Sequence, residues 1–198
     1  MYAFAPLVVA ATLISSLAQV NLPTDRSQTV RQAQADRMEL QQENREALKE
    51  RLQIVKDERK RGIAENIDKR IGEVNQKWVA HWSRTLDRLS AILDKIETRA
   101  ESSEAADLDA FYLALAGARE AIDNAQVAVT TQEGKTYEIV FTDEAILGQA
   151  IRSTIADFHN DLKLTQAAVK EAKDATVMVL RHLKDVVGQE PSGNPETN

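Results

Sequence analysis

The first residues whose types could do chemistry are Gly134, Lys135 and Thr136, which match the end of a phosphate-binding loop. In that loop the backbone N–H groups and the lysine surround the phosphates. The motif also needs a glycine five positions earlier, where this chain has Val129. It requires a strand before the loop and a helix after it, whereas here a helical pattern precedes and an extended pattern follows. The sequence therefore predicts an ordinary turn.

Metal-binding side chains are scattered along the chain. The histidines, His81, His159 and His182, are too far apart to form a ligand pair on one helix turn. Asp157 and Asp161 share a helix face, but two carboxylates without further oxygen ligands hold a cation poorly. With no Cys, thiolate ligands, disulfides and thiol nucleophiles are excluded. We predict no catalytic, cofactor-binding or metal-binding residue, no cofactor, and a protein that is not an enzyme.

The two tryptophans, Trp78 and Trp82, are one helical turn apart with His81 beside them. Large aromatic side chains at this spacing are most often two layers of a helical core. The alternative is a groove lined by the two rings that binds a peptide or an apolar ligand. Which of the two holds depends on whether a neighbouring helix covers this level of the chain.

The net charge argues against nucleic acid as a partner. Asp and Glu outnumber Lys and Arg by 31 to 25, giving a formal charge of −6, and a chain that grips phosphate backbones is usually basic. The basic cluster at residues 56–61 is interrupted by Asp57 and Glu58. We interpret this cluster as a solvated helix face.

A stripe of mostly apolar residues, each three or four positions after the last, runs from Leu48 to Ala100. This spacing predicts a helix. We expect one continuous helix over about residues 24–100, with a thinly apolar arm at its start. The stripe consists of Leu48, Leu52, Val55, Arg59, Ile63, Ile67, Ile71, Val74, Trp78, Trp82, Leu86, Leu89, Leu93, Ile96 and Ala100.

Two shorter stripes predict helices over about residues 107–132 and 143–187. Between them Tyr137, Ile139 and Phe141 alternate with more polar residues, which indicates an extended connection or a short strand. We expect an all-α fold: an elongated three-helix bundle or coiled-coil-like domain over 24–187, followed by a disordered tail at 188–198. The direction of the last helix relative to the first stays open.

The N-terminus has the features of an export signal. Residues 2–20 carry no charge, Leu7 to Ile14 is nearly all apolar, and Ser16, Leu17 and Ala18 suit cleavage before Gln19. We predict a signal peptide over residues 1–18, although the positive charge usual before the apolar run is missing. The alternative is an uncleaved N-terminal anchor, which would be the protein's only contact with a membrane.

The segments ALKERLQIVKDERKRGIAENIDKRIGEVNQKWVAHWSRTLDRLSAILDKIE, GKTYEIVF and AAVKEAKDA together resemble uncharacterised exported helical, coiled-coil-like proteins of bacteria. The resemblance covers about Ala47 to Leu183. It implies an exported, all-helical protein and assigns no activity, cofactor or site residue.

From these features we expect a non-enzymatic scaffold, spacer or interaction module of the cell envelope. Such a protein would be periplasmic or extracellular and would bind a protein partner or a second copy of itself. The alternative is a periplasmic carrier or chaperone-like protein that binds an apolar peptide or ligand at Trp78 and Trp82.

Overall fold

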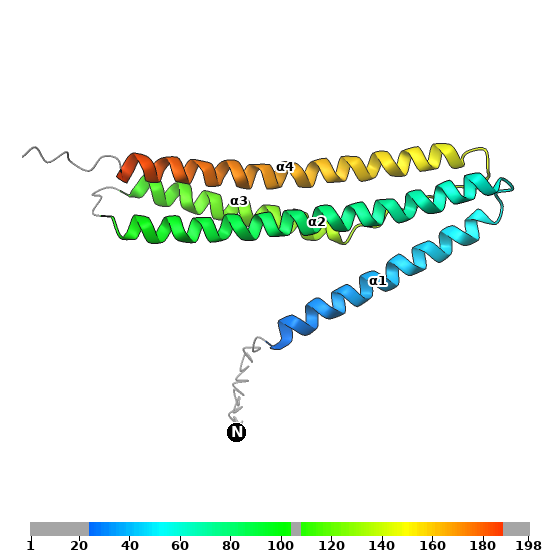
Figure 1. Cartoon of the computed structure of the whole chain (residues 1–198), viewed down its shortest axis with the longest axis horizontal. Coiled ribbons are helices and arrows are strands. Elements are labelled where there is room, and N and C mark those ends of the chain that lie inside the picture. The colour runs from blue at the N-terminus through cyan, green and yellow to red at the C-terminus, as the bar shows by residue number, and fades with distance from the viewer. Residues whose placement is uncertain (1–23, 104–107, 188–198) are drawn as a thin grey trace, which may run out of the picture. The chain divides into compact units, whose positions relative to one another are not determined.

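The computed structural model describes residues 24–103 and 108–187, and four helices make up most of them. They are α1 (Thr24–Leu52), α2 (Glu58–Glu101), α3 (Asp109–Glu133) and α4 (Leu147–Val187) (Figure 1). The described ranges contain no strand, so the predicted all-α class is confirmed. The predicted signal peptide and tail lie outside these ranges. Among the described helices none is long and apolar enough to cross a membrane.

The chain divides into two compact units, residues 1–39 and residues 40–198. In the first unit the described residues, 24–39, are helical, as expected for the arm. The second unit contains residues 40–52 of α1 and all of α2, α3 and α4.

The predicted continuous helix from 24 to 100 is wrong, because the chain breaks at residues 53–57. The Asp57 carboxylate accepts hydrogen bonds from the backbone N–H groups of Arg59 (2.9 Å) and Lys60 (3.4 Å) and so caps the start of α2. Just before it, Val55 is fully buried. The break lets residues 45–52 pack back against the first turns of α2, where Arg45 lies 3.9 Å from Asp68.

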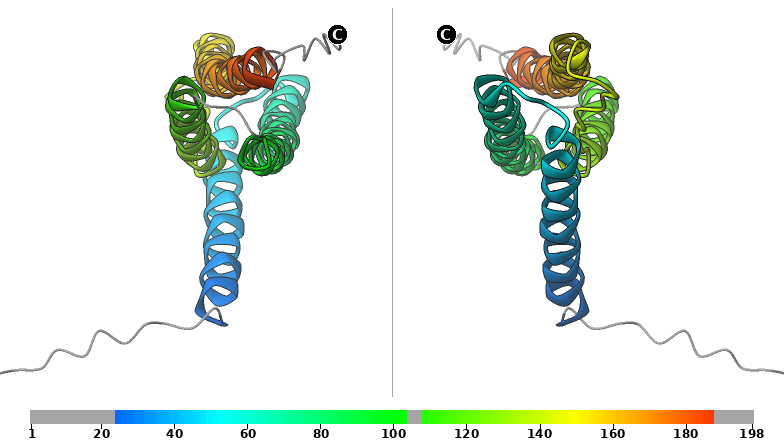
Figure 2. Two further views of the ribbon diagram at one scale, coloured as in Figure 1. Left: turned by 90° about the vertical axis from the view of Figure 1, so that its left-hand side faces the viewer. Right: turned by 90° about the vertical axis from the view of Figure 1, so that its right-hand side faces the viewer.

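Helices α2, α3 and α4 pack against one another in all three pairs, and in end view they occupy the corners of a triangle (Figure 2). The first half of α2 lies beside the first half of α4, and their last turns also lie together, so the two helices run parallel. This settles the direction that the sequence left open. Helix α3, which comes between α2 and α4 in the sequence, runs antiparallel to both (Figure 1).

The extended connection resolves a mismatch in length. Helix α2 has 44 residues and α3 has 25, or about 66 Å and 38 Å at 1.5 Å per residue. Residues 135–141 continue without helix or strand for about 23 Å more at 3.3 Å per residue. They bring the chain to the start of α2, where Lys60 Nζ lies 2.8 Å from Glu144 Oε1. Helix α4 therefore starts level with α2.

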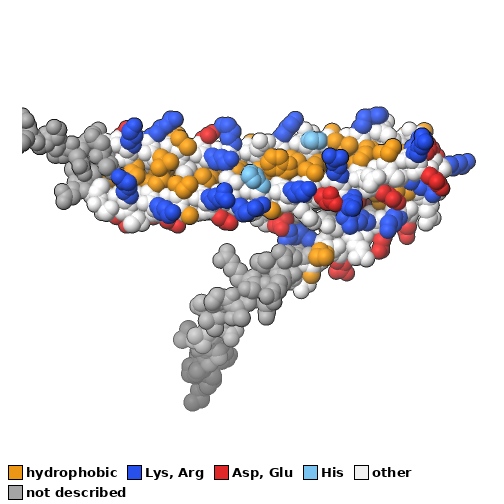
Figure 3. Space-filling model, viewed as in Figure 1, with side chains coloured by type: hydrophobic (Ala, Val, Ile, Leu, Met, Phe, Trp, Pro, Cys, Tyr) orange, Lys and Arg blue, Asp and Glu red, His pale blue; other side chains and the backbone are white. Residues whose placement is uncertain are grey.

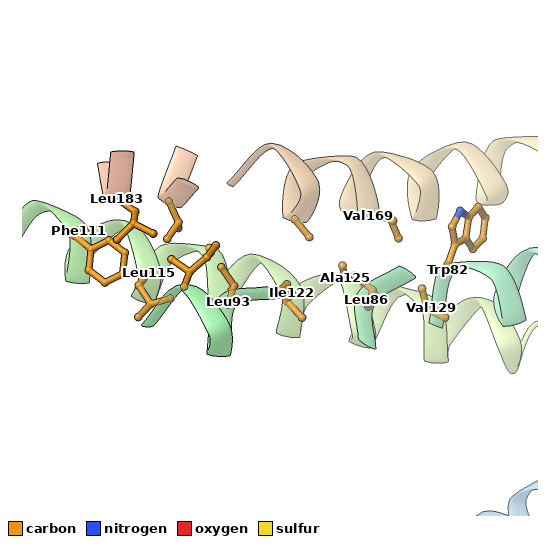
Figure 4. Close-up of a cluster of buried hydrophobic side chains, with 14 of the residues drawn as sticks. Trp82, Leu86, Leu93, Phe111, Leu115, Ile122, Ala125, Val129, Val169 and Leu183 are labelled. Atoms are coloured by element: carbon orange, nitrogen blue, oxygen red, sulfur yellow. The ribbon is translucent and has the colours of Figure 1, made fainter. Parts of the chain in front are cut away.

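The larger core cluster fills the half of the unit that α3 covers (Figure 4). In α3 the buried residues follow a strict seven-residue repeat, with Phe111, Ala118 and Ala125 on one row and Leu115, Ile122 and Val129 on the other. Their partners on α2 and α4 include Trp82, Leu86, Leu93, Val169, Ala172, Val179 and Leu183.

A second core cluster lies in the other half, beyond the end of α3. There the connection and the last turns of α1 take the place of a third helix. The alternation predicted at 137–141 is confirmed, because Ile139 and Phe141 are buried while Glu138 and Val140 are exposed. The buried members of this cluster are Leu48, Leu52, Val55, Ala64, Ile139, Phe141 and Leu147.

Candidate functional site

The outer face between α2 and α4 carries a row of large apolar side chains from both helices, of which Trp78, Ile92, Val177 and Leu180 are exposed. Figure 3 shows apolar side chains running along this face, with Lys and Arg on either side. At 100° per residue, Ile67, Val74, Trp78, Ile92 and Ile96 fall within a sector of about 40° on α2. On α4 a sector of about 60° contains Ile155, Leu162, Val177 and Leu180. We call this surface the α2/α4 face.

Trp78 and Trp82 have different environments on α2. Trp82 is 4% exposed and belongs to the larger core cluster, whereas Trp78 is 40% exposed. Their rings stack with centroids 5.3 Å apart and planes at 30°, and the His81 ring meets Trp78 edge-on at 5.9 Å. The core interpretation thus fits Trp82, and the surface interpretation fits Trp78. One tryptophan supports the other at the α2/α4 face.

A shallow pocket of about 260 Å³ lies on this face one turn before Trp78. Ile67 and Val74 of α2 and Ile155 and Phe158 of α4 supply its apolar walls. Arg70 and His159 stand at its edge. Its lining is suited to an apolar side chain of a partner.

A larger cavity of about 600 Å³ lies near the other end of the face, between the last turns of α2 and α4. Its lining is apolar at the base and basic at the rim. In the linings of these two pockets no nucleophile and base converge.

A buried polar layer separates the two core clusters at the level where α3 ends. Asn75 and Gln132 exchange two hydrogen bonds: Asn75 Nδ2 donates to the Gln132 backbone O (3.1 Å), and Gln132 Nε2 donates to Asn75 Oδ1 (2.8 Å). Gln132 Nε2 also donates to Tyr137 Oη (2.9 Å), which donates to Asp161 Oδ2 (2.9 Å). Lys135 Nζ lies 2.6 Å from Asp161 Oδ1. Because these bonds join α2, α3, the connection and α4, the layer fixes their register beside the α2/α4 face.

Burial raises the pKa of the Tyr137 phenol above its ordinary value of about 10, and its hydrogen bond to Asp161 adds to the shift. Tyr137 therefore stays neutral and donates its hydroxyl proton over the physiological range. Among the described residues the layer leaves one acceptor unsatisfied, because Gln132 Oε1 is buried without a hydrogen-bond partner.

Other residues singled out from the sequence stay apart from the α2/α4 face or from one another. Gly134 caps the end of α3 and Lys135 pairs with Asp161, which agrees with the predicted turn. His159 edges the smaller pocket. Within the described residues no group of three or more His, Asp or Glu side chains is placed to hold a metal ion.

The polar layer and the basic rim could not be recognised from the sequence. Asn75 and Gln132 are ordinary helix residues 57 positions apart, and the rim combines residues from two helices whose pairing is known only from the fold. Only one part of the layer was indicated in advance: the alternating spacing of Tyr137, Ile139 and Phe141 predicted an extended segment here.

Comparisons with known proteins found no relative of this chain: no family model matches it, and no curated protein and no solved structure is significantly similar to it.

Proposed function

We propose that this protein is a non-enzymatic interaction module of the cell envelope, and that it binds an apolar segment of a partner protein on the α2/α4 face. The exposed ring of Trp78 carries the proposal. A large aromatic side chain held in place by a buried neighbour gives contact area at little entropic cost, which is typical of the centre of a binding surface.

In this proposal the α2/α4 face is carried by an elongated three-helix bundle of α2, α3 and α4. Pairwise packing of the three helices supports it, as do the two long parallel helices that form the face. The smaller pocket lies one turn before Trp78, so one apolar side chain of a partner helix can enter it while another, one turn along, covers the Trp78 ring.

Export remains part of the proposal and rests on the uncharged segment 2–20 and the small residues before Gln19. Sequencing of the N-terminus of the protein recovered from its native host tests this part. A mature chain that starts at Gln19 in the envelope fraction supports export. Recovery of the full-length chain in the cytoplasm contradicts it.

The test of the binding surface compares Trp78→Ala with Tyr112→Ala. Tyr112 of α3 is 41% exposed against 40% for Trp78, so it is a matched control from outside the α2/α4 face. Binding of an amphipathic helical peptide is measured by fluorescence anisotropy of a label on the peptide. We expect Trp78→Ala to weaken binding by about tenfold or more and Tyr112→Ala to change it by less than about twofold. Equal losses in the two variants contradict the proposal.

A second candidate is a carrier of a small apolar ligand on the same face, favoured by the size of the larger cavity, about 600 Å³. Leu180→Asp, in the lining of this cavity, and Trp78→Ala, outside it, distinguish the candidates when an apolar dye replaces the peptide. One dye per chain, bound more tightly than any peptide, favours the carrier.

A further inference from the structure

The larger cavity of the α2/α4 face has the two parts that an amphiphile requires. Its base is formed by Ile96 and Leu183, which are 5% and 7% exposed, together with the more accessible Ile92 and Leu180. Its rim carries three cations, Lys95 and Arg99 from α2 and Lys184 from α4. An apolar hollow and a cluster of positive charge thus meet within one volume of about 600 Å³.

The positive charge of this rim is not neutralised by its neighbours. Of the acidic residues of α2 at this level, Asp94 and Glu97 are both paired with Arg119 of α3, at 3.2 Å and 2.6 Å. Glu101 points about 160° around the helix from Arg99. On α4, Asp185 points about 100° around the helix from Lys184. In the described part of the chain none of the three rim cations forms an ion pair. An anion is therefore attracted to this end of the face.

We propose that this cavity binds a single-chain amphiphile with an anionic head group, of the class of long-chain carboxylates. The head group lies among Lys95, Arg99 and Lys184, and the hydrocarbon chain covers Ile92 and Leu180. Arg99 presents a planar fork that can donate two parallel hydrogen bonds to one carboxylate, and the lysines add compact charges.

Volume and charge favour this occupant over others. About 600 Å³ is within the usual range for small-molecule sites. A second copy of this chain, docked cavity to cavity, would bring two sets of three cations together. A bilayer surface meets the outermost side chains, whereas here the least exposed apolar residues, Ile96 and Leu183, line the cavity.

The test is calorimetric titration of the full chain with monomeric dodecanoate, below the concentration at which it forms micelles. 1-Dodecanol and dodecyltrimethylammonium have the same chain with a neutral and a cationic head group. We expect binding of dodecanoate at least about tenfold tighter than of either, since hydrogen bonds to charged groups are worth about one such factor or more.

The variants are Arg99→Gln and Leu180→Asp, with Lys77→Ala as the control. Lys77 lies on the same side of α2 as Lys95 but five turns, or about 27 Å, before it. We expect Arg99→Gln to weaken dodecanoate binding by about tenfold, Leu180→Asp to abolish it, and Lys77→Ala to change it by less than about twofold. Leu180 and Arg99 are exposed, so both variants should fold, and circular dichroism checks this.

Three results would overturn the assignment: equal binding of dodecanoate and dodecanol, an equal loss in Lys77→Ala and Arg99→Gln, or binding only to phosphatidylglycerol vesicles and not to monomeric dodecanoate. The outcome is independent of the peptide test, because Trp78 lies fourteen residues before Ile92 and is left unchanged.

Discussion

The indole rings of Trp78 and Trp82 stack with their centroids 5.3 Å apart, although one ring is 40% exposed and the other 4%. The stacked pair thus connects the larger core cluster, which contains Trp82, with the α2/α4 face, where Trp78 is exposed. Removing the inner ring leaves a cavity, while removing the outer ring leaves a flatter surface. The two substitutions separate stability from binding.

The first prediction is that Trp82→Ala lowers the free energy of unfolding by about 3 to 5 kcal/mol, the range for deleting a buried aromatic side chain. Trp78→Ala should lower it by about 1 to 2 kcal/mol, because much of that ring contacts solvent. Urea denaturation followed by circular dichroism measures both values. Equal losses would place both rings in the core.

The second prediction concerns the buried amide pair. Asn75→Ala deprives Gln132 Nε2 of one acceptor, and we expect a loss of about 1 to 3 kcal/mol, the cost of an unmet buried polar group. In the double variant Asn75→Leu with Gln132→Leu the loss should be smaller than the sum of the losses in Asn75→Leu alone and Gln132→Leu alone, because no half of the pair is left behind. Additive losses would mean that the two amides contribute independently.

The third prediction concerns alkaline pH. The pKa of Tyr137 is raised in the folded state, mainly by burial, so the folded chain binds this proton more tightly than the unfolded chain does. The stabilisation is complete below about pH 10 and declines as the pH rises above it. Tyr137→Phe has no proton to lose. The stability difference between the natural chain and this variant should therefore narrow above about pH 10, which denaturation curves at several pH values measure. A constant difference would contradict the assigned environment.

The fourth prediction concerns glycines inside helices. A Cβ added at Gly62 or Gly117 would meet nothing within 4 Å. We expect Gly62→Ala and Gly117→Ala each to raise the free energy of unfolding by about 0.5 to 1 kcal/mol. Gly134→Ala at the end of α3 is the comparison. There the added Cβ would contact the Thr131 carbonyl oxygen at 3.7 Å instead of open space. A loss at Gly117 would show that a neighbour approaches it more closely.

The stripe on α2 was predicted best from Trp82 onwards, where the buried residues Leu86, Leu93, Ile96 and Ala100 all belong to it. Before Trp82 the stripe residue Ile71 is buried too. The other buried positions there, Ala64, Asn75 and Val79, each lie one residue after a stripe position. The covering partner changes there from α3 to α1 and the connection, so a different side of α2 faces inward. Small and polar residues such as Ala64 and Asn75 give no apolar signal of this change.

The break before α2 was missed because residues 53–57 contain neither Gly nor Pro. Its signal was Asp57 followed by Glu58, a normal helix start that the unbroken apolar spacing outweighed. The last helix, in contrast, was predicted from its stripe and its start within a few residues.

The candidate site was predictable in part. Trp78 could be selected from the sequence because Trp is rare and lay on the stripe, but its exposure depends on which helices flank it. Lys95, Arg99 and Lys184 were not predicted, because only the parallel pairing of α2 and α4 brings residues 85 or more positions apart to one cavity.

The short length of α3 divides α2 into two halves that acquire their packing partners in different ways. The second half pairs with α3 across a brief connection, so these contacts are local in sequence and close a small loop. The first half is covered only by residues about 70 to 90 positions away, in the connection and in α4, apart from the last turns of α1. Contacts of such long separation form late, since more chain entropy is lost before they are made. Amide hydrogens of α2 should therefore exchange with solvent more slowly after Trp82 than before Asn75, and refolding should proceed from the α2–α3 hairpin towards Lys60 and Glu144.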